Sequence, residues 1–104
     1  MTPHRVVIAG RARAAALRIG AWWKENRSAA PHVFGDELAD ALELITTAPG
    51  VGEPWPSTRV RGVRRWLMTK TRYHLYYTVD EARGAVTITV RMIWYAGRAH
   101  GPRL

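Results

Sequence analysis

The chain has 104 residues, of which 47% are hydrophobic, and its 16 Lys and Arg against 8 Asp and Glu give a formal net charge of +8. This length predicts one domain over residues 1–104, because two domains would leave neither half with a proper core. The lack of cysteine excludes disulfides, thiolate metal sites and thiol catalysis, and ten aromatic residues argue against disorder. No apolar run approaches the roughly 18 residues of a membrane span, and the first residues do not show the charged, then apolar, then small-residue pattern of a secretory signal. We therefore expect a cytoplasmic protein without membrane contact.

The first half of the chain predicts one strand and two amphipathic helices. A β-branched run at residues 4–9 (HRVVIA) predicts a strand. Over residues 11–26, apolar side chains recur at steps of three and four, which predicts a helix. Pro31 suits the first turn of a second helix, whose apolar stripe covers residues 33–45 with acidic residues between. Proline and glycine at residues 49–56 end that helix, and the short connector predicts an antiparallel helical hairpin.

The second half predicts strands joined by turns. Residues 63–70, 72–79 and 85–95 have the alternation of strands, and residues 59–60 mark a further short one. A turn at residues 80–84 joins the last two strands. The resulting β-α-α-β-β-β order predicts an α+β domain, with the helical hairpin packed on one face of a largely antiparallel, twisted sheet.

Alternation in the last two predicted strands separates an apolar face from a polar face. The apolar face, which we expect the helices to cover, contains Tyr73, Leu75, Tyr77, Val79, Val86, Ile88, Val90, Met92 and Trp94. The opposite face contains Arg72, His74, Tyr76, Thr78, Thr87, Thr89, Arg91, Ile93 and Tyr95. One of the adjacent Arg64 and Arg65 joins this polar face, and strand parity alone does not decide which.

The positive charge is concentrated in the second half of the chain. Only Asp80 and Glu81 are acidic after Glu53, whereas the same stretch carries nine arginines and one lysine. Arginine suits bidentate or stacked contacts with phosphates, carboxylates and bases. A half this basic is expected to attract a polyanion, either nucleic acid or an acidic protein segment. A solvated basic face, or the composition of an arginine-rich genome, would give the same excess.

The polar sheet face is the one candidate for chemistry. With Arg64 or Arg65 it would supply phosphate clamps, stacking rings and one acid or base, a set able to cleave RNA without metal. No carboxylate is expected there, so His74 would carry the proton chemistry alone, and we favour protein binding over catalysis. Arg and Tyr are also common solvent-facing residues on strands. The four histidines are far apart, and we expect none to pair with a carboxylate one helical turn away, hence no metal site and no cofactor.

Trp22 and Trp23 are adjacent on the first predicted helix. Neighbouring residues of a helix cannot both point into one core, so we expect one of these rings at the surface, available to a partner. A helix sandwiched between two layers would instead bury both.

The ordered set of these segments resembles the RelE/ParE superfamily of toxins from type II toxin–antitoxin modules. The similar segments are residues 22–27 (WWKENR), 30–31 (AP), 34–38 (FGDEL), 48–52 (APGVG), 62–65 (GVRR), 73–77 (YHLYY) and 101–104 (GPRL). The resemblance implies a growth-inhibiting toxin, neutralised by a small antitoxin whose C-terminal segment wraps the helical hairpin and the sheet. A basic, aromatic surface fits such an acidic partner, which folds on binding.

The superfamily has two main activities. RelE-type members cut mRNA in the ribosomal A site with basic residues and a tyrosine, whereas ParE-type members lack that set and poison DNA gyrase. The resemblance puts the Gly-x-Arg arginine of the nuclease branch at Arg64 and its C-terminal arginine near Arg98. The lysines of that branch are absent, and Trp55, Pro56, Arg59 and Arg61 stand in their place. Tyr95 stands earlier in the chain than the late tyrosine of that branch. The resemblance is therefore closer to the ParE branch.

We therefore expect a ParE-like toxin that binds a macromolecular target, with DNA gyrase the first candidate, and that needs no small-molecule cofactor. The candidate target- or antitoxin-binding residues are Trp22, Trp23, Arg64, Arg65, Arg72, Tyr76, Arg91 and Arg98. The alternative is a metal-independent, RelE-like endonuclease that cuts mRNA on the ribosome. Its candidate catalytic residues are Arg64, Arg65, His74, Arg91, Tyr95 and Arg98. A plain nucleic-acid-binding module is disfavoured, because we expect neither helix to have a basic exposed face.

Overall fold

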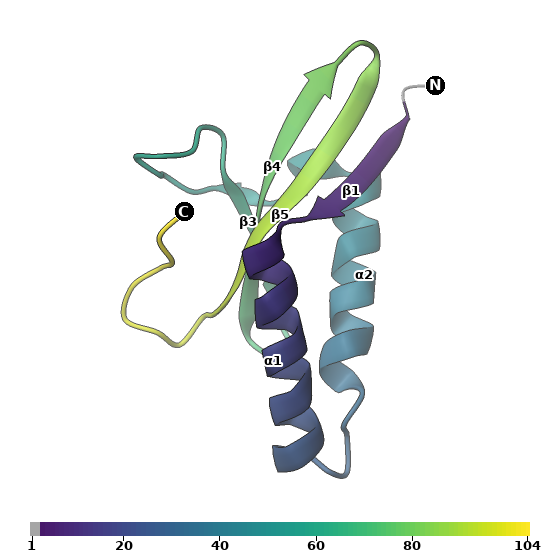
Figure 1. Ribbon diagram of the computed structural model, residues 1–104, viewed down its shortest axis with the longest axis vertical. Helices are drawn as coiled ribbons and strands as arrows, with labels where there is room; N and C mark the ends of the chain where they lie inside the picture. The colour runs from purple at the N-terminus through teal and green to yellow at the C-terminus, as the bar shows by residue number, and fades with distance from the viewer. Residues whose placement is uncertain (1–2) are drawn as a thin grey trace.

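The computed structural model describes residues 3–104. The elements are β1 (His4–Ile8), α1 (Gly10–Asn26), α2 (Val33–Thr47), the 3₁₀ turn η1 (Pro49–Val51), β2 (Glu53–Pro54), β3 (Arg64–Met68), β4 (Tyr73–Ala82) and β5 (Ala85–Tyr95). Both helices cover the same face of a five-stranded sheet and run antiparallel to each other (Figure 1). This confirms the predicted α+β class and the helical hairpin. No helix of residues 3–104 is long and apolar enough to cross a membrane.

The sheet has the strand order β1-β5-β4-β3-β2. β1 runs parallel to β5 and the other three pairings are antiparallel, so the largely antiparallel sheet is confirmed. The long central strands β4 and β5 are joined by Arg83 and Gly84, whose φ angles of 53° and 73° are typical of a tight hairpin turn. The turn is therefore shorter than predicted, since β4 continues to Ala82.

The core lies between the helical hairpin and the sheet. α1 packs mainly on β5, and α2 contacts β1 and β3. The helix residues with the most buried side chains are Ala12, Ala15, Ile19, Phe34, Ala41 and Ile45. Alanine at the contact positions of α1 allows its backbone to approach the sheet closely. Pro31 lies in the turn before α2 rather than in its first helical turn, because His32 occupies the N-cap position.

Three strand predictions were wrong in their boundaries. The strand predicted at residues 63–70 spans only Arg64–Met68. Residues 59–60 form a bend, and the short edge strand is instead β2, on the other side of this loop. Arg72 was expected inside a strand but lies in the turn at residues 69–72, with a left-handed φ of 67°. Its backbone N–H donates to the Met68 carbonyl at 2.8 Å, because the chain must reverse sharply between β3 and β4.

A bulge in β5 changes which of its side chains face the helices. Met92 pairs with Tyr76, and Val90 pairs with the next residue of β4, which leaves Arg91 between them without a partner residue. Four residues beyond the bulge therefore occupy the face opposite to the predicted one: Ile93 and Tyr95 on the helix side, Met92 and Trp94 on the outer side. The prediction assumed unbroken alternation, which one extra residue reverses.

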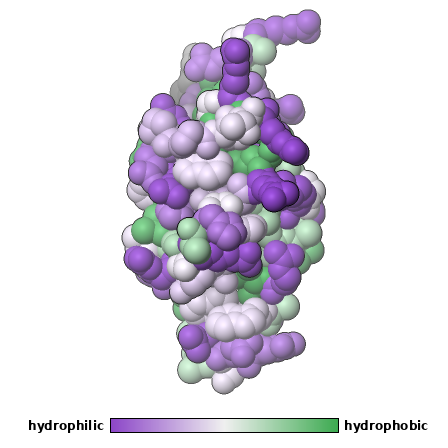
Figure 2. Space-filling model, turned by 90° about the vertical axis from the view of Figure 1, so that its left-hand side faces the viewer, coloured by the Kyte–Doolittle hydropathy of each residue, from purple (hydrophilic) through white to green (hydrophobic). Residues whose placement is uncertain are grey.

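The outer face of the sheet is partly covered by the C-terminal residues 96–104 and the loop 55–62 (Figure 1). The C-terminal segment also reaches α1, where Arg11 Nη1 donates to the Arg103 carbonyl at 2.8 Å. Trp94 Nε1 donates to the His100 carbonyl at 2.9 Å. Pro102 is buried, and Tyr76 is only 1% exposed beneath the Trp55 ring, whose centroid is 4.9 Å away. Seen from this side, the surface is mostly hydrophilic, with small hydrophobic patches (Figure 2).

Candidate functional site

The outer face of the sheet holds part of the predicted polar cluster. Arg65 of β3 pairs with Tyr76 of β4, and the His74 ring centroid lies 5.9 Å from that of Tyr76. Arg91 lies at the bulge of β5, and its Nε donates to Thr78 Oγ1 at 3.1 Å. Two positive side chains, an imidazole and a tyrosine therefore share one face, as predicted.

The register of β3 decides between the adjacent arginines. Arg65 lies on the outer face, where its Nε is paired with Glu53 Oε1. Arg64 lies opposite Tyr77 on the helix side and donates to the Gly52 carbonyl at 2.7 Å. The guanidinium of Arg64 is therefore occupied in holding the segment between η1 and β2.

The electrostatics of the outer face favour a neutral imidazole. Burial, and next the positive charge of Arg65, lower the pKa of His74 below its usual value. A neutral imidazole accepts a proton, but it is a weak base when its pKa is lowered. Sequence reasoning missed Glu53, a carboxylate on this face, whose charge is already paired with Arg65. The hydroxyl-bearing ring of Tyr76 is almost fully buried.

The two arginines that the resemblance assigns to the nuclease branch lie apart. Arg64 is on the helix side of the sheet. The Arg98 guanidinium stacks 4.1 Å from the ring centroid of Trp94, which pairs with His74 and lies on the outer side of the sheet. The remaining candidates, Arg72 and Tyr95, are also absent from the outer face. Arg72 lies in a turn, and the bulge in β5 places Tyr95 on the helix side. The full predicted catalytic set is therefore not assembled.

A second cluster lies where the end of the helical hairpin meets the ends of β4 and β5. We call it the aromatic–basic groove, a hollow of about 590 Å³. It is lined by Trp22, Trp23, Arg27, Lys70, Thr71, Arg72, Tyr73, Tyr95 and Arg98. The side chain of Trp22 is 44% exposed, whereas Trp23 packs against the core. This confirms that one of the two adjacent tryptophans lies at the surface.

Aromatic rings and arginines lie next to one another in this groove. The Arg27 guanidinium lies 5.4 Å from the Trp22 ring centroid and 5.9 Å from that of Trp23, within cation–π range. The Tyr73 and Tyr95 rings meet edge to face at 5.5 Å. Burial, and next the neighbouring Tyr95, raise the pKa of Tyr73, so the Tyr73 phenol is neutral at physiological pH. Tyr95 is 45% exposed, which leaves part of its ring open to a ligand.

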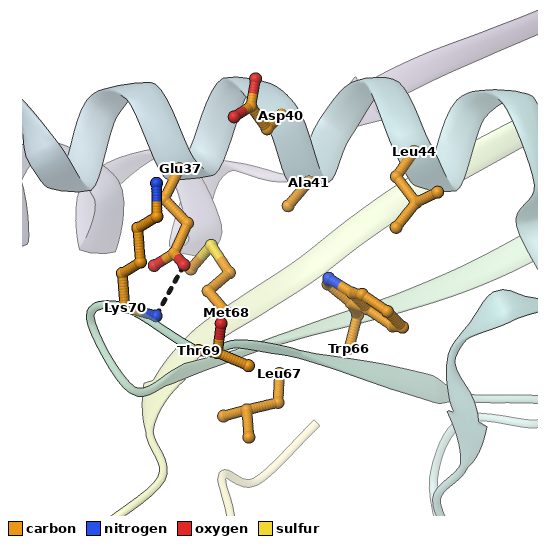
Figure 3. Close-up of a pocket in the computed structure, with 9 residues that line it drawn as sticks. All are labelled: Glu37, Asp40, Ala41, Leu44, Trp66, Leu67, Met68, Thr69 and Lys70. Atoms are coloured by element: carbon orange, nitrogen blue, oxygen red, sulfur yellow. Dashed lines mark hydrogen bonds between the residues drawn. The ribbon is translucent and has the colours of Figure 1, made fainter.

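Glu37 of α2 fixes one wall of the groove, a role that sequence reasoning missed. Its carboxylate accepts hydrogen bonds from the Lys70 N–H at 2.7 Å and from the Thr71 N–H and hydroxyl at 2.9 and 2.7 Å. Figure 3 shows Glu37 reaching from α2 to the β3–β4 turn, beside a hollow of about 220 Å³, while Asp40 points away from that turn. These bonds join residues more than 30 positions apart, a distance over which no local pattern gives a signal.

Two other predictions about charged residues were wrong. His32 Nε2 lies 4.0 Å from Asp36 Oδ2, one helical turn away, where we expected no such pair. The exposed side of α1 is basic, contrary to the expectation for both helices. Its exposed cations are Arg11, Arg13, Arg18 and Lys24. Within residues 3–104, no group of three or more His, Asp or Glu is placed to hold a metal ion.

Comparison with models of known protein families gives no match, and comparison with curated protein sequences gives none either.

Proposed function

We propose that this protein is a ParE-like toxin of a type II toxin–antitoxin module. It acts in the cytoplasm by binding a macromolecular target, with DNA gyrase the first candidate, and a cognate antitoxin neutralises it. The observation that carries the proposal is the fold, a β1-α1-α2 unit followed by strands that form one sheet under the helical hairpin. This is the arrangement that the resemblance to the superfamily implies.

The distribution of charge supports a binding function. The chain carries a net charge of +8, and within residues 3–104 the only ion pairs are Arg65 with Glu53 and His32 with Asp36. Most arginines are therefore available to an acidic partner, such as an antitoxin segment that folds on binding. Exposed Trp22 adds the kind of aromatic anchor that protein interfaces favour.

A RelE-like mRNA endonuclease is the second candidate. The juxtaposition of Arg65, His74 and Tyr76 on the outer face favours it. Against it stand the engagement of Arg64 with a backbone carbonyl and its position on the helix side of the sheet, away from His74. Binding without catalysis is therefore the better supported function.

The test is a supercoiling assay with purified gyrase, run beside an mRNA cleavage assay on translating ribosomes. We expect inhibition of gyrase with trapped cleaved DNA and no cuts in mRNA. Codon-positioned cuts that disappear in His74→Gln, with gyrase unaffected, would establish the endonuclease instead. Arg83→Ala, which removes an exposed charge from the β4–β5 turn away from both clusters, is the matched control and should behave as the unaltered protein. Inactivity in both assays would reject both functions.

A further inference from the structure

We propose that the aromatic–basic groove binds single-stranded nucleic acid, with one base stacked on its exposed rings and the flanking phosphates held by its arginines. This binding site goes beyond the proposed toxin function and does not depend on it. A single strand needs no recognition helix, because its bases are accessible to stacking and its phosphates to cations.

The first observation is the unpaired charge of the groove. Four of its lining side chains are cationic, and no carboxylate lines it. Within residues 3–104, none of Arg27, Arg72 and Arg98 has an ion-pair partner. Glu37, which fixes the adjoining wall, accepts three hydrogen bonds from Lys70 and Thr71 of the β3–β4 turn. The groove therefore presents donor-only groups to an anion.

The second observation is that flat rings lie open beside these cations. Trp22 and Tyr95 are both about half exposed although both are large apolar groups. The Arg27 guanidinium lies next to the Trp22 ring, so a base stacked there would bring its phosphate within reach of that cation. A hollow of about 590 Å³ is within the range of small-ligand sites, and so has room for a nucleotide.

The open rings of the groove favour a nucleic acid over an acidic peptide. An extended peptide binds proteins most readily by adding a strand to a free sheet edge. The groove lies at the start of β4 and the end of β5, and residues 91–95 of β5 extend beyond the pairing with β1, so a short backbone edge is free there. An acidic peptide would use that edge and the cations but has no base to stack on Trp22 and Tyr95, whereas a nucleotide uses both the cations and the rings.

The experiment measures fluorescence anisotropy of a fluorescein-labelled oligothymidylate of about eight nucleotides, a length within the range of known single-strand sites. Stacking of one base predicts that Trp22→Ala weakens binding by about 5- to 150-fold. If three phosphates are held, the logarithm of the affinity should fall against the logarithm of salt concentration with a slope of about −2. Arg27→Ala should reduce the magnitude of that slope by about 0.7.

Two controls separate stacking from the attraction of any polyanion. Arg59→Ala removes the same charge from an exposed loop outside the groove and should change affinity less than Arg27→Ala. An abasic oligomer of the same length carries the same phosphates without bases and should bind the unaltered protein as weakly as the thymidylate binds Trp22→Ala. The abasic test does not require any variant to fold.

Several outcomes would overturn the proposal. If the abasic oligomer binds as tightly as the thymidylate, or if Arg59→Ala and Arg27→Ala weaken binding equally, the interaction depends on net charge alone. Tighter, Trp22-dependent binding of an oligoglutamate peptide would assign the groove to an acidic protein segment. Displacement of the thymidylate by micromolar AMP would identify a free nucleotide as the ligand source, whereas displacement only by unlabelled strand identifies the single strand. The gyrase and ribosome assays contain no such probe, so this proposal and the toxin function can fail separately.

Discussion

Tyr77 offers the sharpest test of how the fold is held together. Its side chain is fully buried in β4, and its hydroxyl donates to the Pro49 carbonyl at 2.7 Å. The same hydroxyl accepts the Gly52 N–H at 2.9 Å. Burial raises the pKa of Tyr77, so the phenol stays neutral and keeps its donor. This single oxygen therefore ties the segment between α2 and β2 to the central sheet.

Tyr77→Phe keeps the ring and removes only that oxygen. The buried Gly52 N–H then loses its partner, and a buried unsatisfied donor costs about 1–3 kcal/mol. The Pro49 carbonyl belongs to a part-exposed residue, so water replaces much of its lost hydrogen bond. We expect the free energy of unfolding to fall by about 2–3 kcal/mol, and the melting temperature by about 8–24 °C.

The assay is urea and thermal unfolding followed by near-ultraviolet circular dichroism. Tyr95→Phe is the matched control, because this hydroxyl is on a half-exposed ring, and it should change stability by less than about 0.5 kcal/mol. If Tyr77→Phe also stays within about 0.5 kcal/mol of the unaltered protein, the hydroxyl is not the link between these segments and the reasoning fails.

Three further predictions concern the same framework. Gly52→Ala should lower the free energy of unfolding in urea by about 1–3 kcal/mol, because the added Cβ would lie 2.6 Å from the Tyr77 hydroxyl and 2.9 Å from the Arg65 carbonyl. An unchanged urea midpoint would contradict this expectation. Glu37→Ala should lower the free energy of unfolding by about 1.5–3 kcal/mol and speed amide exchange at Thr71. Glu37→Gln should have a smaller effect because it retains an acceptor, and equal effects of the two variants would refute the hydrogen-bond account. Folding lowers the pKa of His74, so the unfolded chain takes up the proton first, and the free energy of unfolding should fall as the pH drops below about 6.5. His74→Gln should lack this part of the pH dependence, and identical pH profiles of the two proteins would refute the prediction.

The sequence alone determined the kinds of element and their order. The step of three and four residues in α1 and the alternation in β4 and β5 are local properties, set by how side chains leave a helix or a strand. The bounds of β5 were predicted without error, because Gly84 and Gly97 delimit a continuous β-branched and aromatic run. The clustering of positive charge in the second half is likewise a property of the sequence.

Only the tertiary structure decided which side chains meet. The pairing of Arg65 with Tyr76 chose between two adjacent arginines, and one unpaired residue, Arg91, moved Tyr95 from the outer face to the groove. Covering of the outer face by residues 96–104 and the anchoring of the β3–β4 turn by Glu37 depend on contacts between distant segments. Register, bulges and long-range hydrogen bonds are set by the free energy of the whole packed chain, whereas local periodicity constrains only each element by itself.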